Sequence, residues 1–224
     1  MDISSKPQIT KFIEDRISKG SIQAVILYGS FARGNANPTS DVDLMFVVTD
    51  GFLSSISEFD DLYFEIIEAT EEAYKTHWTS KPDLDRLFCF WKYAKILYDF
   101  NGAGNRLQKY AQDLLKKGKT KMSCEKITNN LKAANKRLEK IKYLFHIDPT
   151  SANVILEQYF LTYLESWFTV NGIWKPQEKE YIEIISKKDL LLGKLINAFY
   201  NSGAKTEDKI TVAQNAIQRI FKTN

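Results

Sequence analysis

The chain has 224 residues, of which 44% are hydrophobic, and these values suit one large domain or two small ones rather than a disordered protein. No apolar stretch is long enough to span a bilayer, and the first residues lack the charged and apolar regions of a secretion signal. The two cysteines, Cys89 and Cys124, form neither a metal motif nor a disulfide framework, so we expect a cytoplasmic protein.

The net charge of +3 hides an asymmetry along the chain. Residues 1–100 contain 10 lysines and arginines against 16 aspartates and glutamates, a balance of −6, whereas residues 101–224 contain 21 against 12, a balance of +9. Such a shift indicates two units with different surfaces. The basic segment 116–142 lacks the interleaved aromatic residues that stack on bases, so we interpret its lysines as the solvent face of a helix and predict no nucleic-acid partner.

Apolar periodicity predicts alternating helices and strands in the first part of the chain. Apolar residues at helical spacing follow Pro7, and Gly20 is placed to end that helix. Short apolar runs rich in β-branched and aromatic residues indicate buried strands. The predicted strands are 22–28, 42–48, 62–67 and 94–98, and two further helices are predicted at 70–78 and 82–91.

The second part of the chain has a helical pattern throughout. Apolar residues three or four apart mark a helix over 127–145, and Pro149 opens an apolar helix that ends at about Val170. Pro176, Gly193 and a turn near 202–203 divide the remainder into three shorter helices.

The change of pattern near residues 101–104 marks a domain boundary. We therefore predict an α+β domain at residues 1–103, with a small mixed sheet and flanking helices. An all-α helical bundle domain follows at residues 104–224.

Two polar motifs lie at the ends of the first two predicted strands. Gly29 and Ser30 follow the first strand, where glycine lets the backbone approach an anion and the hydroxyl donates a hydrogen bond, and Arg33 can neutralise a phosphate. Asp41 and Asp43 head the second strand. Because strand side chains alternate between faces, their carboxylates project from one face, about 6–7 Å apart along the chain, and can share divalent cations.

These motifs resemble the signature of the DNA polymerase β-like nucleotidyltransferase superfamily, and most of all its small bacterial aminoglycoside and minimal members. The resemblance covers about residues 20–100, including the strand 96–99 with Gly102 after it, whereas the helical part is only loosely similar to the C-terminal bundles of this family. It implies two Mg²⁺ ions and ATP or another nucleoside triphosphate as co-substrate. The nucleotide-binding residues that it implies are Gly29, Ser30, Arg33 and Ser40.

The resemblance also implies a third carboxylate on a neighbouring strand. A lone acid inside an apolar strand is costly unless a metal or hydrogen bonds satisfy it, and Glu65 shares its strand face with Tyr63 and Ile67. Glu65 matches the family position, so we predict it as a catalytic residue and metal ligand together with Asp41 and Asp43. The other candidates for this third carboxylate are Asp60, Asp61 and Glu68.

The implied reaction is the attack of an acceptor hydroxyl on the α-phosphate of a nucleoside triphosphate, with release of pyrophosphate. We expect AMP from ATP as the transferred group and a small, aminoglycoside-like acceptor. The alternative is an antitoxin-type or regulatory enzyme that modifies a protein or RNA partner. The general base stays open between Glu65 and an acid of the helical part, Glu157 or Glu165.

Overall fold

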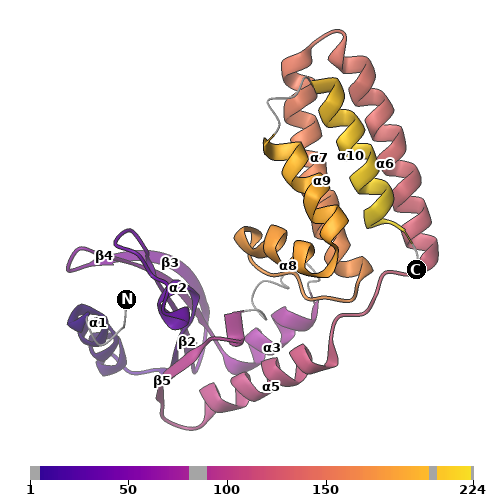
Figure 1. Cartoon of the computed structure of the whole chain (residues 1–224). Helices are drawn as coiled ribbons and strands as arrows, with labels where there is room; N and C mark the ends of the chain where they lie inside the picture. The colour runs from indigo at the N-terminus through magenta and orange to yellow at the C-terminus, as the bar shows by residue number, and fades with distance from the viewer. Residues whose placement is uncertain (1–5, 81–89, 202–205, 223–224) are drawn as a thin grey trace. The chain divides into compact units, whose positions relative to one another are not determined.

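The computed structural model describes residues 6–80, 90–201 and 206–222. The chain divides into two compact units, one ending at Lys117 and the other beginning at Gly118 (Figure 1). The first unit combines a mixed sheet with helices, and the regular elements described in the second unit are all helices, which confirms the predicted fold class.

The division lies after helix α5 (Ala103–Lys117), whereas the predicted boundary lies at the start of this helix. Helix α5 packs on the sheet of the first unit. A Cβ atom added to Gly104 would lie 3.1 Å from the Cβ atom of Ala24 on the first strand and 3.4 Å from the Cγ2 atom of Ile96 on the last. This close packing explains why α5 belongs with the sheet rather than with the helices that follow.

The first unit alternates helices and strands, and the four predicted strands are present. The predicted helix at 82–91 lies almost wholly outside the described residues. The elements before α5 are α1 (Pro7–Ser18), β1 (Ile22–Leu27), α2 (Gly29–Arg33), β2 (Val42–Val48), β3 (Phe52–Phe59), β4 (Leu62–Ala69), α3 (Glu71–Ser80) and β5 (Lys95–Asp99).

The five strands form one sheet in the order β3-β4-β2-β1-β5. Strand β1 is antiparallel to both β2 and β5, and β3 is antiparallel to β4. Strands β2 and β4 are parallel to each other, which makes the sheet mixed, as predicted.

Helix α1 covers one face of this sheet. Its residues Ile9, Phe12 and Ile13 are buried together with side chains from β2 and β4, and the ring of Phe12 stacks on that of Phe64 with centroids 4.0 Å apart. The β2 residues in this core, among them Val42 and Leu44, alternate with Asp43. Burial of the even-numbered positions therefore turns Asp43 to the other face of the sheet.

Helices α3 and α5 cover part of that other face. The buried hydroxyl of Tyr74 on α3 donates hydrogen bonds to the carbonyl oxygens of Phe46 (3.2 Å) and Ile67 (2.8 Å), which attaches this helix to β2 and β4. The Arg106 guanidinium of α5 binds the Glu71 carboxylate of α3, with Nη2–Oε2 at 2.7 Å. Both carbonyl groups lie further along their strands than Asp43 and Glu65.

Strand β3 is absent from the sequence-based prediction. It forms a hairpin with β4, joined by Asp60 and Asp61, whose φ angles of 47° and 62° suit a two-residue turn of the type that follows strand twist. The serines at positions 54, 55 and 57 interrupt its apolar residues, so no continuous run marks it. Pairing with β4 creates this strand despite the weak local signal.

The regular elements described in the second unit are helices, and the turn predicted near 202–203 lies outside the described residues. The long helix predicted from Pro149 is confirmed, with Asp148 as its N-cap and Asn171 as its C-cap. The three shorter helices are also present, but Gly193 does not separate two of them: the break lies at Asp189, whose carboxylate accepts a hydrogen bond from the Leu192 amide. The elements are α6 (Cys124–Phe145), α7 (Pro149–Val170), the 3₁₀ turn η3 (Glu178–Glu180), α8 (Tyr181–Lys188), α9 (Leu190–Asn201) and α10 (Thr206–Ile220).

Over the parts of the chain that the structure describes, no helix combines the length and the apolar character needed to cross a bilayer.

Candidate active site

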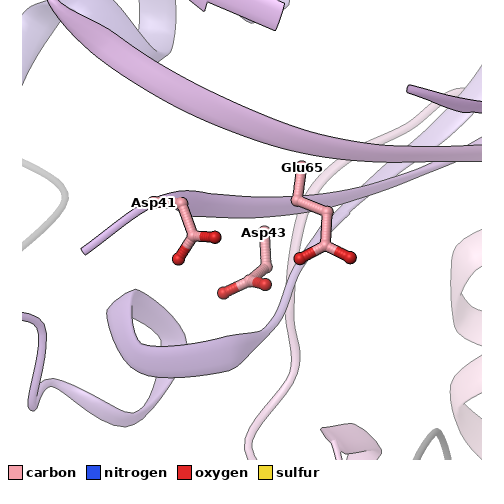
Figure 2. A group of neighbouring side chains, drawn as sticks. All are labelled: Asp41, Asp43 and Glu65. Atoms are coloured by element: carbon pink, nitrogen blue, oxygen red, sulfur yellow. The ribbon is translucent and has the colours of Figure 1, made fainter. Parts of the chain in front are cut away.

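Three acidic side chains meet at one end of the sheet. Asp41 immediately precedes β2, Asp43 lies within β2, and Glu65 lies on β4 directly opposite Asp43 in the parallel pairing. Each offers a carboxylate oxygen, and these oxygens all lie within 4.8 Å of one another. Figure 2 shows the three side chains on the same side of the two strands. The fold thus brings together the three residues that the sequence predicts as metal ligands.

The other candidates for the third carboxylate lie elsewhere. Glu68 takes the opposite face of β4 and forms an ion pair with Arg16 of α1. Asp60 in the hairpin turn pairs with Lys11, with Oδ2–Nζ at 3.2 Å, and Asp61 is its neighbour in that turn. Among the four candidates, Glu65 is therefore the one that the fold places beside the two aspartates.

Gly29, the first residue of α2, lies directly against Asp43. Its φ angle of +67° falls in the left-handed region that favours glycine, and a Cβ atom added there would overlap the Asp43 carboxyl group. The Tyr28 amide, just before it, donates a hydrogen bond to the Asp43 carbonyl oxygen at 3.0 Å. Backbone conformation and close approach thus both require glycine at this position.

Ser30 and Arg33 present polar groups beside the carboxylates. The Ser30 backbone N–H lies beside the Asp43 carboxylate and helps to lower the pKa of Asp43. The Ser30 hydroxyl oxygen and the Arg33 Nε are buried and have no hydrogen-bond partner among the described residues. Because a buried polar group without a partner is costly, these two atoms indicate that a polar ligand completes the site.

Ser40 lies in the turn before Asp41. Its hydroxyl oxygen accepts a hydrogen bond from the Asn37 amide at 2.9 Å, and its own amide donates one to the Asn37 carbonyl oxygen at 3.0 Å. The side chain therefore closes the loop that returns the chain to β2. Since a hydroxyl can accept and donate at once, its proton is still available to another acceptor.

Burial and repulsion between like charges together determine the electrostatics of the site. Burial, followed by the neighbouring charges of Asp41 and Glu65, raises the pKa of Asp43 to about 7, against a smaller lowering effect of Arg33. A bound cation relieves such repulsion, and carboxylate oxygens are the ligands that Mg²⁺ prefers. The donor set therefore fits a divalent cation held by Asp41, Asp43 and Glu65.

Tyr28 is a neighbour of the carboxylates that the motif does not single out. The residue is 3% exposed, and its ring centroid lies 5.1 Å from that of Phe90. Burial, followed by the negative charges of Asp43 and Glu65, raises the pKa of its phenol. The sequence does not mark Tyr28 as a site residue, because a tyrosine at the end of an apolar run is typical of a core strand.

The alternative general bases, Glu157 and Glu165 of α7, each bind a lysine of the second unit. The Oε1 atom of Glu157 lies 2.9 Å from Lys209 Nζ. The Oε1 atom of Glu165 lies 3.3 Å from Lys175 Nζ and accepts a hydrogen bond from the Tyr181 hydroxyl at 3.2 Å. These contacts account for both acids, and they favour Glu65 as the acid that acts with the two aspartates.

Comparisons with known proteins agree with this geometry. Residues 9–88 match the family of nucleotidyltransferase domains, and this segment contains Gly29 and all three carboxylates. A nucleotidyltransferase-like protein from Exiguobacterium sibiricum has a similar fold, with a TM-score of 0.54 over 96% of this chain and 73% of that one, at 13% sequence identity. No curated protein matches the sequence.

Proposed function

We propose that this chain, whose residues 9–88 match the nucleotidyltransferase domain family, is an enzyme that transfers AMP from ATP to a hydroxyl group of a small molecule. In this reaction the acceptor oxygen forms a bond to the α-phosphorus of ATP. The bond from this phosphorus to the pyrophosphate oxygen breaks, and pyrophosphate leaves with the bonding electrons. The proton of the acceptor hydroxyl passes to a base of the enzyme.

The convergence of Asp41, Asp43 and Glu65, with oxygens within 4.8 Å of one another, is the observation that carries this proposal. We assign these residues as the ligands of two Mg²⁺ ions. Such ions supply charge stabilisation at the attacking and leaving oxygens of an in-line displacement. The raised pKa of Asp43 supports the assignment, because it reflects burial of this carboxyl group, followed by repulsion from Asp41 and Glu65, and a bound cation would offset both effects.

Glu65 is our choice for the residue that accepts the proton of the acceptor hydroxyl. It is exposed, whereas Asp43 between β1 and β4 is partly buried. An acceptor can therefore approach Glu65 from the hairpin side of the sheet. Proton acceptance by a carboxylate within hydrogen-bond reach is an established route to activate a hydroxyl.

The nucleotide-binding residues of this proposal are Gly29, Ser30, Arg33 and Ser40. The unpartnered Ser30 hydroxyl and Arg33 Nε support the assignment, because phosphate oxygens are acceptors that both groups can use. Gly29 supports it through the absence of a side chain beside Asp43, which leaves the carboxylate accessible. Ser40 is assigned through the hydroxyl proton that its turn leaves available.

A small acceptor of neutral or cationic character fits the charge of the first hundred residues, whose balance of −6 does not favour an anion. An aminoglycoside-like compound meets this requirement. We place the reaction in the cytoplasm, a reducing compartment that suits the exposed free thiol of Cys124.

The test is incubation with ATP, Mg²⁺ and a panel of hydroxyl compounds, followed by mass spectrometry for AMP adducts and an assay of pyrophosphate. We expect an adduct with the unaltered enzyme and a loss of at least about 100-fold with Asp43→Asn, because losing even an outer-shell partner of a metal costs 10- to 100-fold. Asp61→Asn is the matched control, since it makes the same change in the exposed hairpin turn.

Equal activity of Asp43→Asn and Asp61→Asn would contradict the metal role. If labelled AMP from ATP appears in a protein or RNA fraction and in no small molecule, the small acceptor is replaced by a macromolecular one.

A further inference from the structure

The β3–β4 hairpin carries exposed apolar side chains on the face of the sheet that holds the carboxylates. Ile56 on β3 is the direct cross-strand partner of Glu65, and it is 78% exposed. Tyr63 precedes Glu65 by two residues on β4, so it shares the face of Glu65, and it is 57% exposed. We call Ile56 and Tyr63 together the hairpin platform.

The platform is continuous with the candidate active site. Directly opposed residues of antiparallel strands have Cβ atoms about 4.5–5.5 Å apart, so Ile56 flanks Glu65 on the side away from Asp43. Tyr63 lies two residues before Glu65 on β4, just as Asp41 lies two residues before Asp43 at the start of β2. Carboxylates and apolar side chains therefore form one surface across β2, β4 and β3.

The two faces of the hairpin differ in burial. One face packs against α1, whereas the apolar residues on the carboxylate face have no such covering among the residues that the structure describes. On the opposite face, Phe59 packs edge-on against Phe12 of α1, with ring centroids 5.6 Å apart. On the carboxylate face of β3, Ser54, Ile56 and Glu58 are all exposed. An exposed isoleucine and an exposed tyrosine on neighbouring strands, next to the carboxylates, offer apolar surface that a ligand can cover.

The order of the strands indicates whether the hairpin platform faces the acceptor or the nucleotide. The nucleotide-binding turn follows β1 and precedes β2, whereas the platform lies on β4 and β3, on the other side of Glu65. A group that transfers its proton to Glu65 and attacks the α-phosphate arrives from the side opposite the leaving group. The platform is thus placed for the acceptor and not for the nucleotide.

We propose that the hairpin platform binds the acceptor, and that the acceptor is a neutral or cationic hydroxyl compound with an apolar or aromatic face. The inference rests on the proposed nucleotidyl transfer, and it names the class of acceptor. Ile56 and Tyr63 supply the apolar contact. Glu58, the cross-strand partner of Tyr63, joins the three carboxylates in disfavouring an anionic acceptor.

Three primary alcohols serve as probes because they share the reacting group and differ in the feature at issue. Benzyl alcohol is neutral and aromatic, ethanol lacks the ring, and 4-(hydroxymethyl)benzoate adds a negative charge. With ATP and Mg²⁺ we expect kcat/KM for AMP transfer to benzyl alcohol to exceed the values for the other two by about tenfold, the effect of partly covering one apolar side chain.

Ile56→Thr and Tyr63→Thr should each reduce the preference for benzyl alcohol over ethanol to about twofold or less, with strand propensity retained. Leu53→Thr is the matched control, because Leu53 is also an exposed apolar residue of β3 (46%) but points to the opposite face, where it pairs with Glu68. Leu53→Thr should keep the full preference.

A preference that survives both platform substitutions, or that Leu53→Thr removes equally, would overturn the inference. So would a dimer that dissociates on Ile56→Thr, because the platform would then be an interface between two copies. Saturation-transfer NMR of benzyl alcohol with the protein, Mg²⁺ and a non-hydrolysable ATP analogue separates this inference from the proposed function. If no alcohol accepts AMP but the NMR contact is lost in Ile56→Thr, the platform stands as a binding surface and the transfer activity fails.

Discussion

The carboxyl group of Asp43 occupies the space that a side chain at position 29 would need. Gly29 therefore does more than allow a turn: it lets α2 begin directly beside a charged residue of β2, at a φ angle of +67°. This arrangement keeps the short helix beside Asp43, where Ser30 helps to lower the pKa of the carboxyl group. The relationship can be tested without touching any carboxylate.

Gly29→Ala should reduce the rate of AMP transfer by at least about 100-fold, because the added methyl group displaces the Asp43 carboxyl group from its partners. The matched control is Gly34→Ala, which has a similar φ angle of +77° but nothing within 4 Å of the added Cβ atom. The control should lose about 1–2 kcal/mol of unfolding free energy from backbone strain and keep its activity. Denaturant unfolding and AMP transfer, measured on both variants, separate the loss of stability from the loss of activity. Similar activities would show that the close approach has no functional role.

Stability against pH should report the burial of Asp43. Its ordinary pKa is 3.8, and burial with the repulsion of Asp41 and Glu65 raises it to about 7 in the folded protein. Charging Asp43 therefore costs the folded state nothing below about pH 4, an increasing amount between pH 4 and 7, and the full amount above pH 7. In a chelator such as EDTA, Asp43→Asn should gain melting temperature relative to the unaltered protein as the pH rises through this window.

Asp61→Asn provides the reference for that measurement, because Asp61 lies in the exposed hairpin turn. Its melting temperature relative to the unaltered protein should be nearly constant over the same range. An Asp43→Asn difference that is equally flat would show that the folded state does not resist the charge of Asp43.

Ser30→Ala should weaken ATP binding by about threefold to tenfold, the value of one hydrogen bond. The unfolding free energy should not fall, because the buried hydroxyl has no partner among the described residues. Ser40→Ala offers a contrast, since its hydroxyl accepts from the Asn37 amide, and this variant should lose about 0.5–1.5 kcal/mol of stability. Titration calorimetry with an ATP analogue and chemical unfolding separate the two effects. A destabilised Ser30→Ala with unchanged ATP affinity would assign Ser30 a structural role.

The choice of general base leads to another comparison. Glu65→Gln should lower kcat by about 100-fold to 10,000-fold, the range for removing a general base. Glu157→Gln and Glu165→Gln should stay within about twofold, because the lysine contacts of these acids account for them. Single-turnover rates with saturating ATP are the appropriate measurement. A large loss in one of the α7 variants with a mild loss in Glu65→Gln would move the base to the second unit.

The elements that surround the site could largely be predicted because their signals are local. Alternation along β2 places Asp41 and Asp43 on one face, and the same rule separates Glu65 from Glu68 on β4. Pairing is not local: that Glu65 lies directly opposite Asp43 depends on the register of two parallel strands, which no motif encodes. From the sequence alone, the choice of Glu65 therefore rests on a family position.

Strand β3 could not be predicted from the sequence, because its local signals are weak. Serines separate its apolar residues, and the apolar residues on its open face are exposed rather than buried, so neither a continuous run nor burial explains it. The break between α8 and α9 also depends on a side-chain contact, the cap that Asp189 provides, and not on Gly193, which lies inside α9. Where tertiary contacts override local propensity, the sequence alone places elements incorrectly.

The claim that Asp41, Asp43 and Glu65 together hold the catalytic metal is tested most directly by anomalous diffraction from crystals grown with Mn²⁺ and a non-hydrolysable ATP analogue. The account predicts metal peaks at about 2.1 Å from carboxylate oxygens of all three residues, with the α-phosphate of the analogue at the same site. A nucleotide bound with its metal away from these carboxylates, or metal peaks that exclude Glu65, would contradict it.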